Sequence, residues 1–263
     1  MGIAFDGANI WVANFYGNTV TKLRASDETT LGTFSAGSGP AGIAFDGTNM
    51  WVANSGSGSV TKLRASDGAG LGTFNVGSTP ARIAFDGANM WVTDYSSNTV
   101  SKLRASDGAT LGVFNVGTFP QAIVFDGANI WVTNRASNTV TQLRASDGAT
   151  LGTFSAGSGP DGIAFDGTNI WVTNAFGNTV TELRTSDGAT LGTFNVGSFP
   201  TDIAFDGANI WVTNQSGNTV SKLRVSDGTM LGTFNAGTQP SGIAFDGANM
   251  WVANYGSGSV SKL

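Results

Sequence analysis

Short hydrophobic runs alternate with turns rich in Gly, Asn, Asp and Ser along the whole chain, and this pattern repeats every forty residues. Within each run large apolar residues alternate with small or polar ones, and no helical periodicity is present. The period is marked by seven tryptophans, which are Trp11, Trp51, Trp91, Trp131, Trp171, Trp211 and Trp251. A constant period of this length is typical of repeat architectures, so we expect one structural unit per repeat.

Residues 41–80 contain one complete unit, and its turn residues divide it into four predicted strands. Strand A covers 42–45, strand B 50–53, strand C 59–64 and strand D 71–74. An Asp-Gly pair separates A from B and a Ser-Asp-Gly turn separates C from D, as is typical of hairpins. The position before strand C needs a residue that tolerates a left-handed backbone. It is filled by Asn18, Gly58, Asn98, Asn138, Asn178, Asn218 and Gly258.

A four-stranded meander cannot bury both of its faces alone, so neighbouring sheets must pack face to face. We therefore predict an all-β fold, a seven-bladed β-propeller of four-stranded antiparallel blades in one domain, residues 1–263. The strand D motif Leu-Gly-(Thr/Val)-Phe occurs six times, so the seventh blade is expected to lack its outermost strand. We expect a monomer, or weak self-association through the unpaired edge of that blade. The repeats are 1–40, 41–80, 81–120, 121–160, 161–200, 201–240 and the partial 241–263.

Composition narrows the functions that this fold can carry. The tryptophans are assigned to the core, because one copy in every blade is what packing between blades requires. The chain has no histidine and no cysteine, which removes the usual general base and the soft metal ligands and argues against an enzyme. Its net charge of −5 argues against nucleic acid, and no apolar run is long enough for a membrane helix. We expect no cofactor and no bound metal.

The repeat resembles the YVTN/NHL-type propeller repeat, with Trp-Val-Thr-Asn at 131–134, 171–174 and 211–214 where that family has Tyr-Val-Thr-Asn. The blocks Pro-Asp-Gly-Ile-Ala-Phe-Asp at 160–166 and Asn-Thr-Val at 178–180 match the same pattern. The resemblance implies a propeller with one of many functions, in a secreted or cell-surface bacterial protein. It extends loosely to virginiamycin B lyase, whose activity is associated with a histidine and a magnesium site that match no residue here.

Differences among the repeats collect in two sets of loops, the B–C loops and the D–A loops with the residues just before strand A. Strand direction places both sets at one end of every blade, which we call the variable face. The opposite end has nearly invariant A–B and C–D turns and is called the constant face. Candidate ligand-binding residues of the variable face are Phe15, Tyr16, Arg82, Asp94, Tyr95, Phe119, Arg135, Asp161, Phe176, Phe199, Asp202 and Tyr255.

Three hypotheses for function follow. The first is a non-enzymatic binding or scaffold module whose variable face recognises a polar ligand, a glycan or a peptide segment. The second is a repeat-amplified or engineered propeller without a specific ligand, in which the loops have drifted. The third is a divalent-ion-dependent lyase or hydrolase using Asp161 and Asp202, although we expect these two to be solvated loop acids. Arg82 and Asp94, unique to the third repeat, are predicted to form an exposed ion pair.

Overall fold

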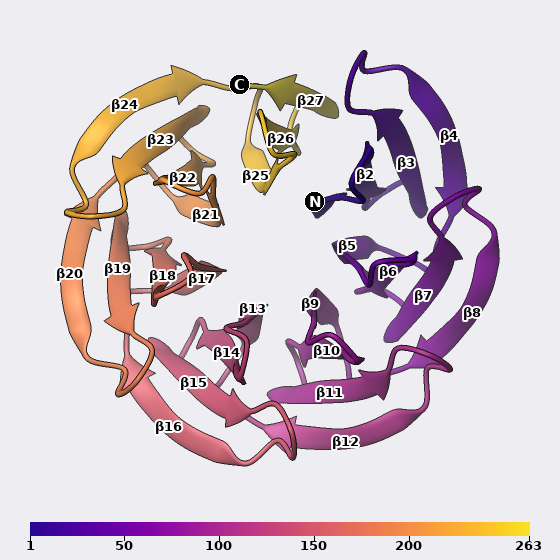
Figure 1. Ribbon diagram of the computed structural model, residues 1–263, viewed down its shortest axis with the longest axis horizontal. Coiled ribbons are helices and arrows are strands. Elements are labelled where there is room, and N and C mark those ends of the chain that lie inside the picture. The colour runs from indigo at the N-terminus through magenta and orange to yellow at the C-terminus, as the bar shows by residue number, and fades with distance from the viewer. The chain divides into compact units, whose positions relative to one another are not determined.

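The computed structural model describes all residues from 1 to 263, and its regular secondary structure consists entirely of strands. The chain is a seven-bladed β-propeller in which each blade is an antiparallel sheet with its strands in chain order (Figure 1). Six blades have four strands and the seventh has three, as the motif count predicts. No helix is present that is long and apolar enough to cross a membrane.

The chain divides into two compact units, Met1–Pro120 and Gln121–Leu263, each built of whole blades. The expected single domain therefore stays a prediction. The strands of the first unit are β1 (Ile3–Phe5), β2 (Asn9–Asn14), β3 (Thr19–Arg24), β4 (Thr30–Ser35), β5 (Pro40–Phe45), β6 (Asn49–Asn54), β7 (Ser59–Arg64), β8 (Gly70–Asn75), β9 (Pro80–Phe85), β10 (Asn89–Asp94), β11 (Thr99–Arg104) and β12 (Thr110–Asn115).

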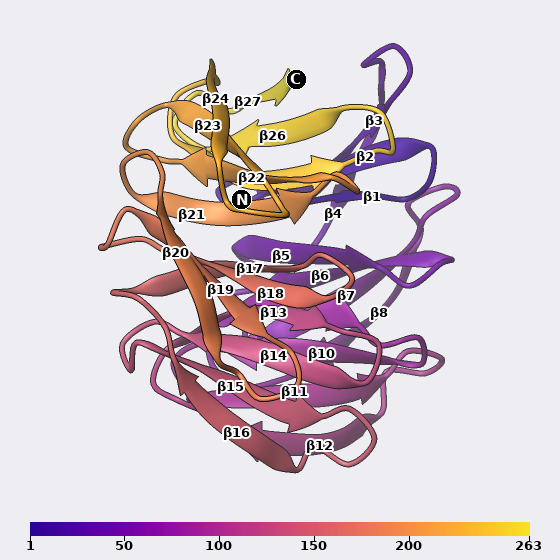
Figure 2. The same ribbon diagram turned by 60° about the vertical axis from the view of Figure 1, so that its left-hand side comes forward.

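The second unit begins with β13 and ends with the three-stranded blade. Its strands are β13 (Pro120–Phe125), β14 (Asn129–Asn134), β15 (Thr139–Arg144), β16 (Thr150–Ser155), β17 (Pro160–Phe165), β18 (Asn169–Asn174), β19 (Thr179–Arg184), β20 (Thr190–Asn195), β21 (Pro200–Phe205), β22 (Asn209–Asn214), β23 (Thr219–Arg224), β24 (Met230–Asn235), β25 (Pro240–Phe245), β26 (Met250–Asn254) and β27 (Ser259–Lys262). Figure 2 shows consecutive blades of this unit stacked sheet on sheet.

The predicted strands agree with the observed ones. Strand C of the second repeat has the predicted bounds, whereas strands A, B and D extend one or two residues further. The residue before strand C has a positive φ in every blade, from 53° at Asn18 to 60° at Gly58, Asn98 and Gly258. The backbone therefore turns where the Asn and Gly residues permit a left-handed conformation.

The tryptophans lie in the core, as predicted, and the core sits between successive sheets. Trp11 is fully buried and packs with Ile43 and Met50 of the next blade. On its own sheet Trp11 lies 5.5 Å from the ring of Phe34 in strand D, and the pair recurs in the five blades that follow. Such aromatic pairs bury a large apolar area and prefer this offset geometry. The three-stranded blade lacks this phenylalanine, so Trp251 has no aromatic partner of this kind.

The A–B turn shows why its sequence varies so little. Asp46 Oδ1 accepts hydrogen bonds from the backbone amides of Thr48 and Asn49, and Gly47 has a φ of 92°. The other oxygen, Oδ2, accepts a hydrogen bond of 2.7 Å from the buried indole Nε1–H of Trp51. Burial raises the pKa of Asp46, but these hydrogen bonds outweigh it and hold the pKa below its ordinary value. One carboxylate thus shapes the turn and satisfies a buried donor of the core.

Candidate functional site

The B–C and D–A loops lie together at the same end of each blade, as strand direction predicts. Backbone amides of the B–C loop donate to carbonyl groups of the preceding D–A loop, for example Tyr95 to Thr79 at 3.1 Å and Ala175 to Gly159 at 2.8 Å. The variable face is therefore a hydrogen-bonded surface of paired loops on a rigid β frame. Loops supported in this way are common places for binding function.

One position in the D–A loops bears a conformational cost. The residue before the proline that begins strand A has a positive φ, which glycine adopts most easily, and Gly39 and Gly159 occupy it in two loops. Phe119 and Phe199 occupy the same position with φ of 56° each, although a bulky residue is strongly disfavoured there. The backbone amides of Phe119 and Phe199 donate hydrogen bonds of 2.9 Å to the side-chain carbonyls of Asn98 and Asn178. Glycine would adopt the same backbone conformation at a lower energetic cost.

Four of the predicted residues converge in the second unit, and we call them the Arg135 cluster: Arg135, Asp161, Phe176 and Phe199. Arg135 Nη1 lies 2.7 Å from Asp161 Oδ2. The guanidinium carbon of Arg135 lies 5.1 Å from the ring centre of Phe176 and 5.6 Å from that of Phe199. The two rings meet edge to face with their centres 5.8 Å apart. A cation, its carboxylate partner and two aromatic rings from two successive repeats therefore form one connected set.

Burial within the Arg135 cluster is uneven. The side chain of Asp161 is 4% exposed and that of Arg135 is 21% exposed, so the ion pair lies below the surface. Phe176, in contrast, is 60% exposed and lies over the guanidinium. The expectation that Asp161 is a solvated loop acid is therefore wrong. A buried carboxylate must be paired to be tolerated, and here the next blade's carboxylate neutralises Arg135, which leaves the cluster an uncharged aromatic surface.

The variable-face loops of the first unit hold two further aromatic pairs. Tyr95 stacks on Phe119 with ring centres 4.7 Å apart and an angle of 7° between the rings. Phe15 and Tyr16 meet edge to face at 5.3 Å, and Tyr16 is 79% exposed. In this unit as well, the aromatic residues that depart from the repeat gather in adjacent loops.

The predicted exposed ion pair between Arg82 and Asp94 is wrong. Asp94 is fully buried and accepts hydrogen bonds from Gly77 N, Thr99 Oγ1 and Ser101 Oγ. The guanidinium of Arg82 donates instead to the carbonyl of Ala81. Strand pairing explains the error. Arg82 N bonds to Thr93 Oγ1, while the side chain of Asp94 turns toward strand C and the preceding D–A loop.

Asp94 replaces the asparagine that the other blades place at this buried position. Asn54 donates its Nδ2 hydrogens to Ser59 Oγ and Thr61 Oγ1, whereas Asp94 accepts hydrogens from the matching hydroxyls. Burial raises the pKa of Asp94 to about 6, although the three hydrogen bonds that it accepts act in the opposite direction. Asp94 is thus a buried titratable group of the frame and does not present a charge to a ligand.

The two remaining candidates lie outside the Arg135 cluster. The carboxylate of Asp202 accepts hydrogen bonds from Ile203 N at 3.0 Å and from Ile243 N of the next blade at 3.2 Å. It therefore links the first strands of two blades, and the expectation of a solvated loop acid is wrong for it too. Tyr255 lies in the B–C loop of the last blade, and its amide donates to Gln239 O at 2.9 Å. No group of three or more His, Cys, Asp or Glu side chains is placed to hold a metal.

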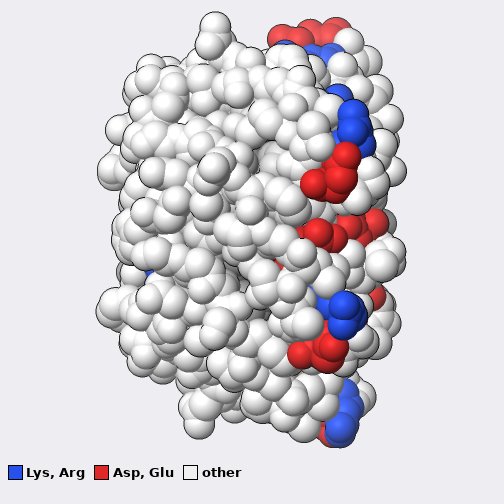
Figure 3. Space-filling model, turned by 90° about the vertical axis from the view of Figure 1, so that its left-hand side faces the viewer, with Lys and Arg blue, Asp and Glu red and all other residues white.

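The constant face carries chemistry that the sequence analysis missed. Figure 3 shows charged side chains along one edge of the visible surface, while most of the rest is uncharged. In every complete blade a C–D turn pairs an arginine with an aspartate, for example Arg184 with Asp187 at 3.0 Å. The fourth residue of strand C is lysine in five blades but Gln142 and Glu182 in two neighbouring ones. Comparing the repeats column by column would have revealed both departures.

Glu182 alters its surroundings. Its carboxylate accepts a hydrogen bond of 2.8 Å from Asn169 Nδ2. Burial, and secondarily the charge of Asp166, raises the pKa of Glu182.

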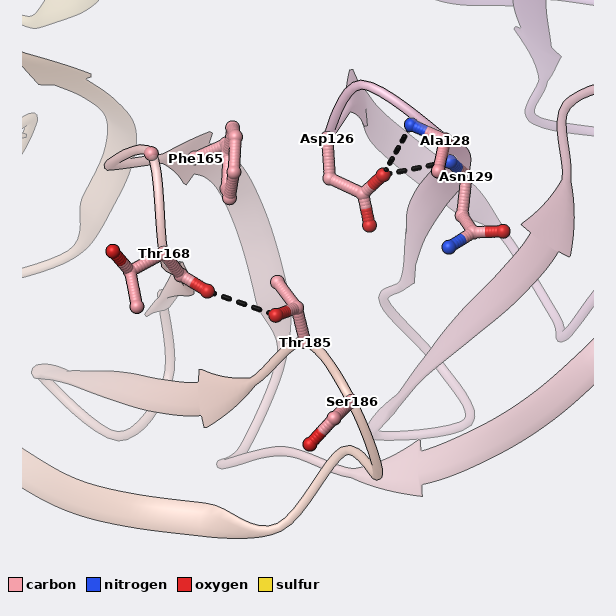
Figure 4. A pocket seen from close by; sticks show the side chains of 8 residues that line it. Asp126, Ala128, Asn129, Phe165, Thr168, Thr185 and Ser186 are labelled. Atoms are coloured by element: carbon pink, nitrogen blue, oxygen red, sulfur yellow. Dashed lines mark hydrogen bonds between the residues drawn. The ribbon is translucent and has the colours of Figure 1, made fainter.

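In the preceding blade, a hollow of about 440 Å³ lies between the A–B turn and the next blade, and its lining includes Asp126 and Thr185 (Figure 4).

Comparisons with known proteins support the fold. No protein-family model matches the chain, and no curated protein matches it. Among solved structures, Kuenenia stuttgartiensis hydrazine synthase matches with a TM-score of 0.87 and 19% identity, over 100% of this chain and 94% of that one. Virginiamycin B lyase from Staphylococcus aureus matches with a TM-score of 0.84 and 19% identity, over 99% and 93%.

A catalytically inactive form of the same lyase with quinupristin, in which one histidine is replaced by alanine, matches with a TM-score of 0.85 and 20% identity over 99% and 93%. These similarities confirm the propeller fold, related to that of virginiamycin B lyase, and at such identities they extend to the fold alone.

Proposed function

We propose that the protein is a non-enzymatic binding module whose variable face holds an uncharged glycan. The observation that carries the proposal is the Arg135 cluster. Two successive repeats depart from the consensus at Arg135, Asp161, Phe176 and Phe199, and these four side chains form one connected set of contacts. Independent drift of exposed loops gives no reason for an arginine in one repeat to meet a buried carboxylate from the next.

The positive φ of Phe199 and Phe119 supports the same proposal. A glycine at either position would relieve a strain of roughly 1 kcal/mol, and Thr79 and Gln239 take the same conformation in two other loops with smaller side chains. An aromatic ring at such a position is consistent with a surface on which the ring contacts a ligand.

The chemistry of the surface favours a neutral carbohydrate among the ligands considered. Arg135 is neutralised by Asp161, and Asp94 and Asp202 are occupied within the frame. The exposed ring of Phe176 provides a flat apolar surface, and the neighbouring loops of the same unit contain Ser, Thr, Asn and Gln. Aromatic rings that stack on sugar rings, with amides and hydroxyls beside them for the sugar hydroxyls, are the groups that such a ligand requires.

Binding is proposed in preference to catalysis because of the residue types in the chain. The chain has no histidine, whereas the solved lyase is described as inactive when one histidine is replaced. Neither Asp161 nor Asp202 is placed as a general base, since one is held by Arg135 and the other by two backbone amides. We expect no turnover of quinupristin with added magnesium. Turnover abolished by Asp161→Asn or Asp202→Asn would reverse this assignment.

The test is a screen of neutral oligosaccharides by glycan array, followed by calorimetry on the hits. Phe176→Ser, which introduces the residue that the sixth blade has at this position, should weaken binding about tenfold, as expected for the loss of one stacked ring. Leu191→Ser is the matched control, because Leu191 is 42% exposed on strand β20, outside the variable face. Equal affinity of the two variants, or binding of peptides in place of oligosaccharides, would overturn the proposal.

A further inference from the structure

The lysine of strand C forms a buried ammonium site between blades. Lys22 Nζ donates to the carbonyls of Ala65 at 2.6 Å and Ser66 at 3.3 Å, both in the C–D turn of the next blade. The same atom lies 5.1 Å from the ring centre of Trp11. Lys22 is only 7% exposed, so its charge is held by two carbonyl dipoles and an aromatic face.

The arrangement recurs in the second blade. Lys62 Nζ donates to Ala105 O at 2.7 Å and to Ser106 O at 3.2 Å, and it lies 4.9 Å from the ring centre of Trp51. Lys62 lines a hollow of about 370 Å³ whose wall also includes Asp46 and Ser106. The repeat therefore builds the same cation site in each of these blades, with the cation supplied by the chain itself.

The fourth blade keeps the site but lacks the cation. Gln142 replaces the lysine and makes one hydrogen bond, from Nε2 to Thr185 O at 3.3 Å. Asp126 Oδ2 still accepts the indole hydrogen of Trp131 at 2.7 Å. Removing a lysine while the turn aspartate remains makes the local charge more negative by one unit.

Side chains around the hollow respond to this change. In blades one, two, three, six and seven the amide of the turn asparagine donates to the turn aspartate, for example Asn49 Nδ2 to Asp46 Oδ2 at 3.2 Å. In the fourth blade that bond is missing, and Asp126 accepts only the backbone amides and the indole. Figure 4 shows Asp126 and Asn129 on one side of the hollow, with Thr185 and Ser186 on the other.

We propose that this hollow binds a primary ammonium group from outside the chain, in the place where other blades insert lysine. The Asp126 carboxylate supplies the opposite charge, and the carbonyls of Thr185 and Ser186 correspond to those that hold Lys22 and Lys62. The Thr185 carbonyl also accepts the long hydrogen bond from Gln142, and its second lone pair is available to an amine. An amine suits this set because it donates several hydrogen bonds, as the lysines do. The site is on the constant face and is independent of the proposed glycan surface.

The experiment follows the indole resonance of Trp131 in ¹⁵N-labelled protein during titration with n-butylammonium chloride. Because the indole N–H of Trp131 donates a hydrogen bond to Asp126, its resonance should shift until the site is saturated, while the resonances of the other six tryptophans stay unchanged. Tetramethylammonium chloride at equal ionic strength carries the charge without N–H donors and should cause no such shift. A peptide with a single lysine tests whether the ammonium of a protein is accepted as well as that of a free amine.

Gln142→Lys restores the residue of five other blades and is the matched variant. It should fold, melt at a higher temperature than the parent protein and abolish the response of Trp131 to butylammonium, because the new ammonium fills the site. An equal response to tetramethylammonium, or to potassium chloride, would show a general ionic effect and overturn the proposal. A response that persists in Gln142→Lys would also overturn it.

Discussion

The two ends of each blade differ in what their turns are required to do. At the constant face, Asp46 serves both the turn and the indole of Trp51, so a change of this residue damages local backbone and core together. At the variable face, Phe176 is mostly exposed and contacts other loop residues, so its replacement leaves the sheets intact. Repetition is therefore strict where one side chain satisfies two structural needs and relaxed where it satisfies none.

The largest expected effect on the free energy of unfolding comes from a substitution on the constant face. Asp46→Ala removes two turn hydrogen bonds and leaves the buried indole of Trp51 without an acceptor, which should destabilise the protein by about 4 kcal/mol. Urea unfolding followed by tryptophan fluorescence measures the loss. Asp67→Ala is the control, since it removes an exposed C–D turn aspartate that has no contact with a tryptophan. Equal losses in the two variants would show that the indole bond contributes nothing.

The second-largest expected effect on stability concerns Asp94, the buried aspartate that stands where the other blades have asparagine. The unfolded chain ionises this residue near 3.8, whereas the folded protein keeps the proton up to a pKa of about 6. The folded state therefore binds more protons in this window, and its stability falls as the pH rises from about 4 to 6. Asp94→Asn, which restores the residue of the other blades, should increase the free energy of unfolding at pH 8 by roughly 3 kcal/mol.

Chemical unfolding at a series of pH values checks this expectation. The gain from Asp94→Asn should be largest above pH 6 and should shrink as the pH falls below 3.8, where the folded and unfolded chains both hold the proton. A gain that is the same at all pH values would point to packing instead of ionisation.

A smaller effect is expected at the three-stranded blade. Extending the chain after Leu263 with Arg-Ala-Ser-Asp-Gly-Ala-Thr-Leu-Gly-Thr-Phe should add a fourth strand and give Trp251 the phenylalanine partner of the other blades. Burying one aromatic ring supports a gain of about 2 kcal/mol, or about 5 °C in melting temperature. Self-association should fall because the edge of β27 becomes paired. A Gly-Ser extension of equal length is the control, and an equal melting temperature would refute the strand.

The smallest effect on stability belongs to the variable face. Phe176→Ser removes one exposed ring and its contact with Arg135, which should cost less than about 1 kcal/mol. The same denaturation assay measures it, so the value can be set directly beside that for Asp46→Ala. A loss comparable with that of the constant turn would mean that the Arg135 cluster holds the frame together and would weaken its assignment to binding.

Much of the site list could be predicted because position in the repeat fixes position in the blade. The B–C loop residue Arg135 and the D–A loop residue Phe199 were both placed correctly at one end of the sheets. What failed were the statements about side-chain partners. Asp94 was paired with Arg82 because their strand ends are adjacent, but adjacency in a hairpin leaves open toward which neighbour a side chain turns.

The sequence by itself determined the number of repeats, the four-strand meander, the left-handed turn before strand C and the buried tryptophans. Each of these follows from local chemistry or from a period that any observer can count. Only the tertiary structure decided that Asp161 meets Arg135 across two blades, that Asp94 is buried, and that Lys22 reaches carbonyls forty-three and forty-four residues away. Contacts between successive sheets depend on rotamers and on how the sheets are stacked, and a repeat pattern along one chain specifies neither.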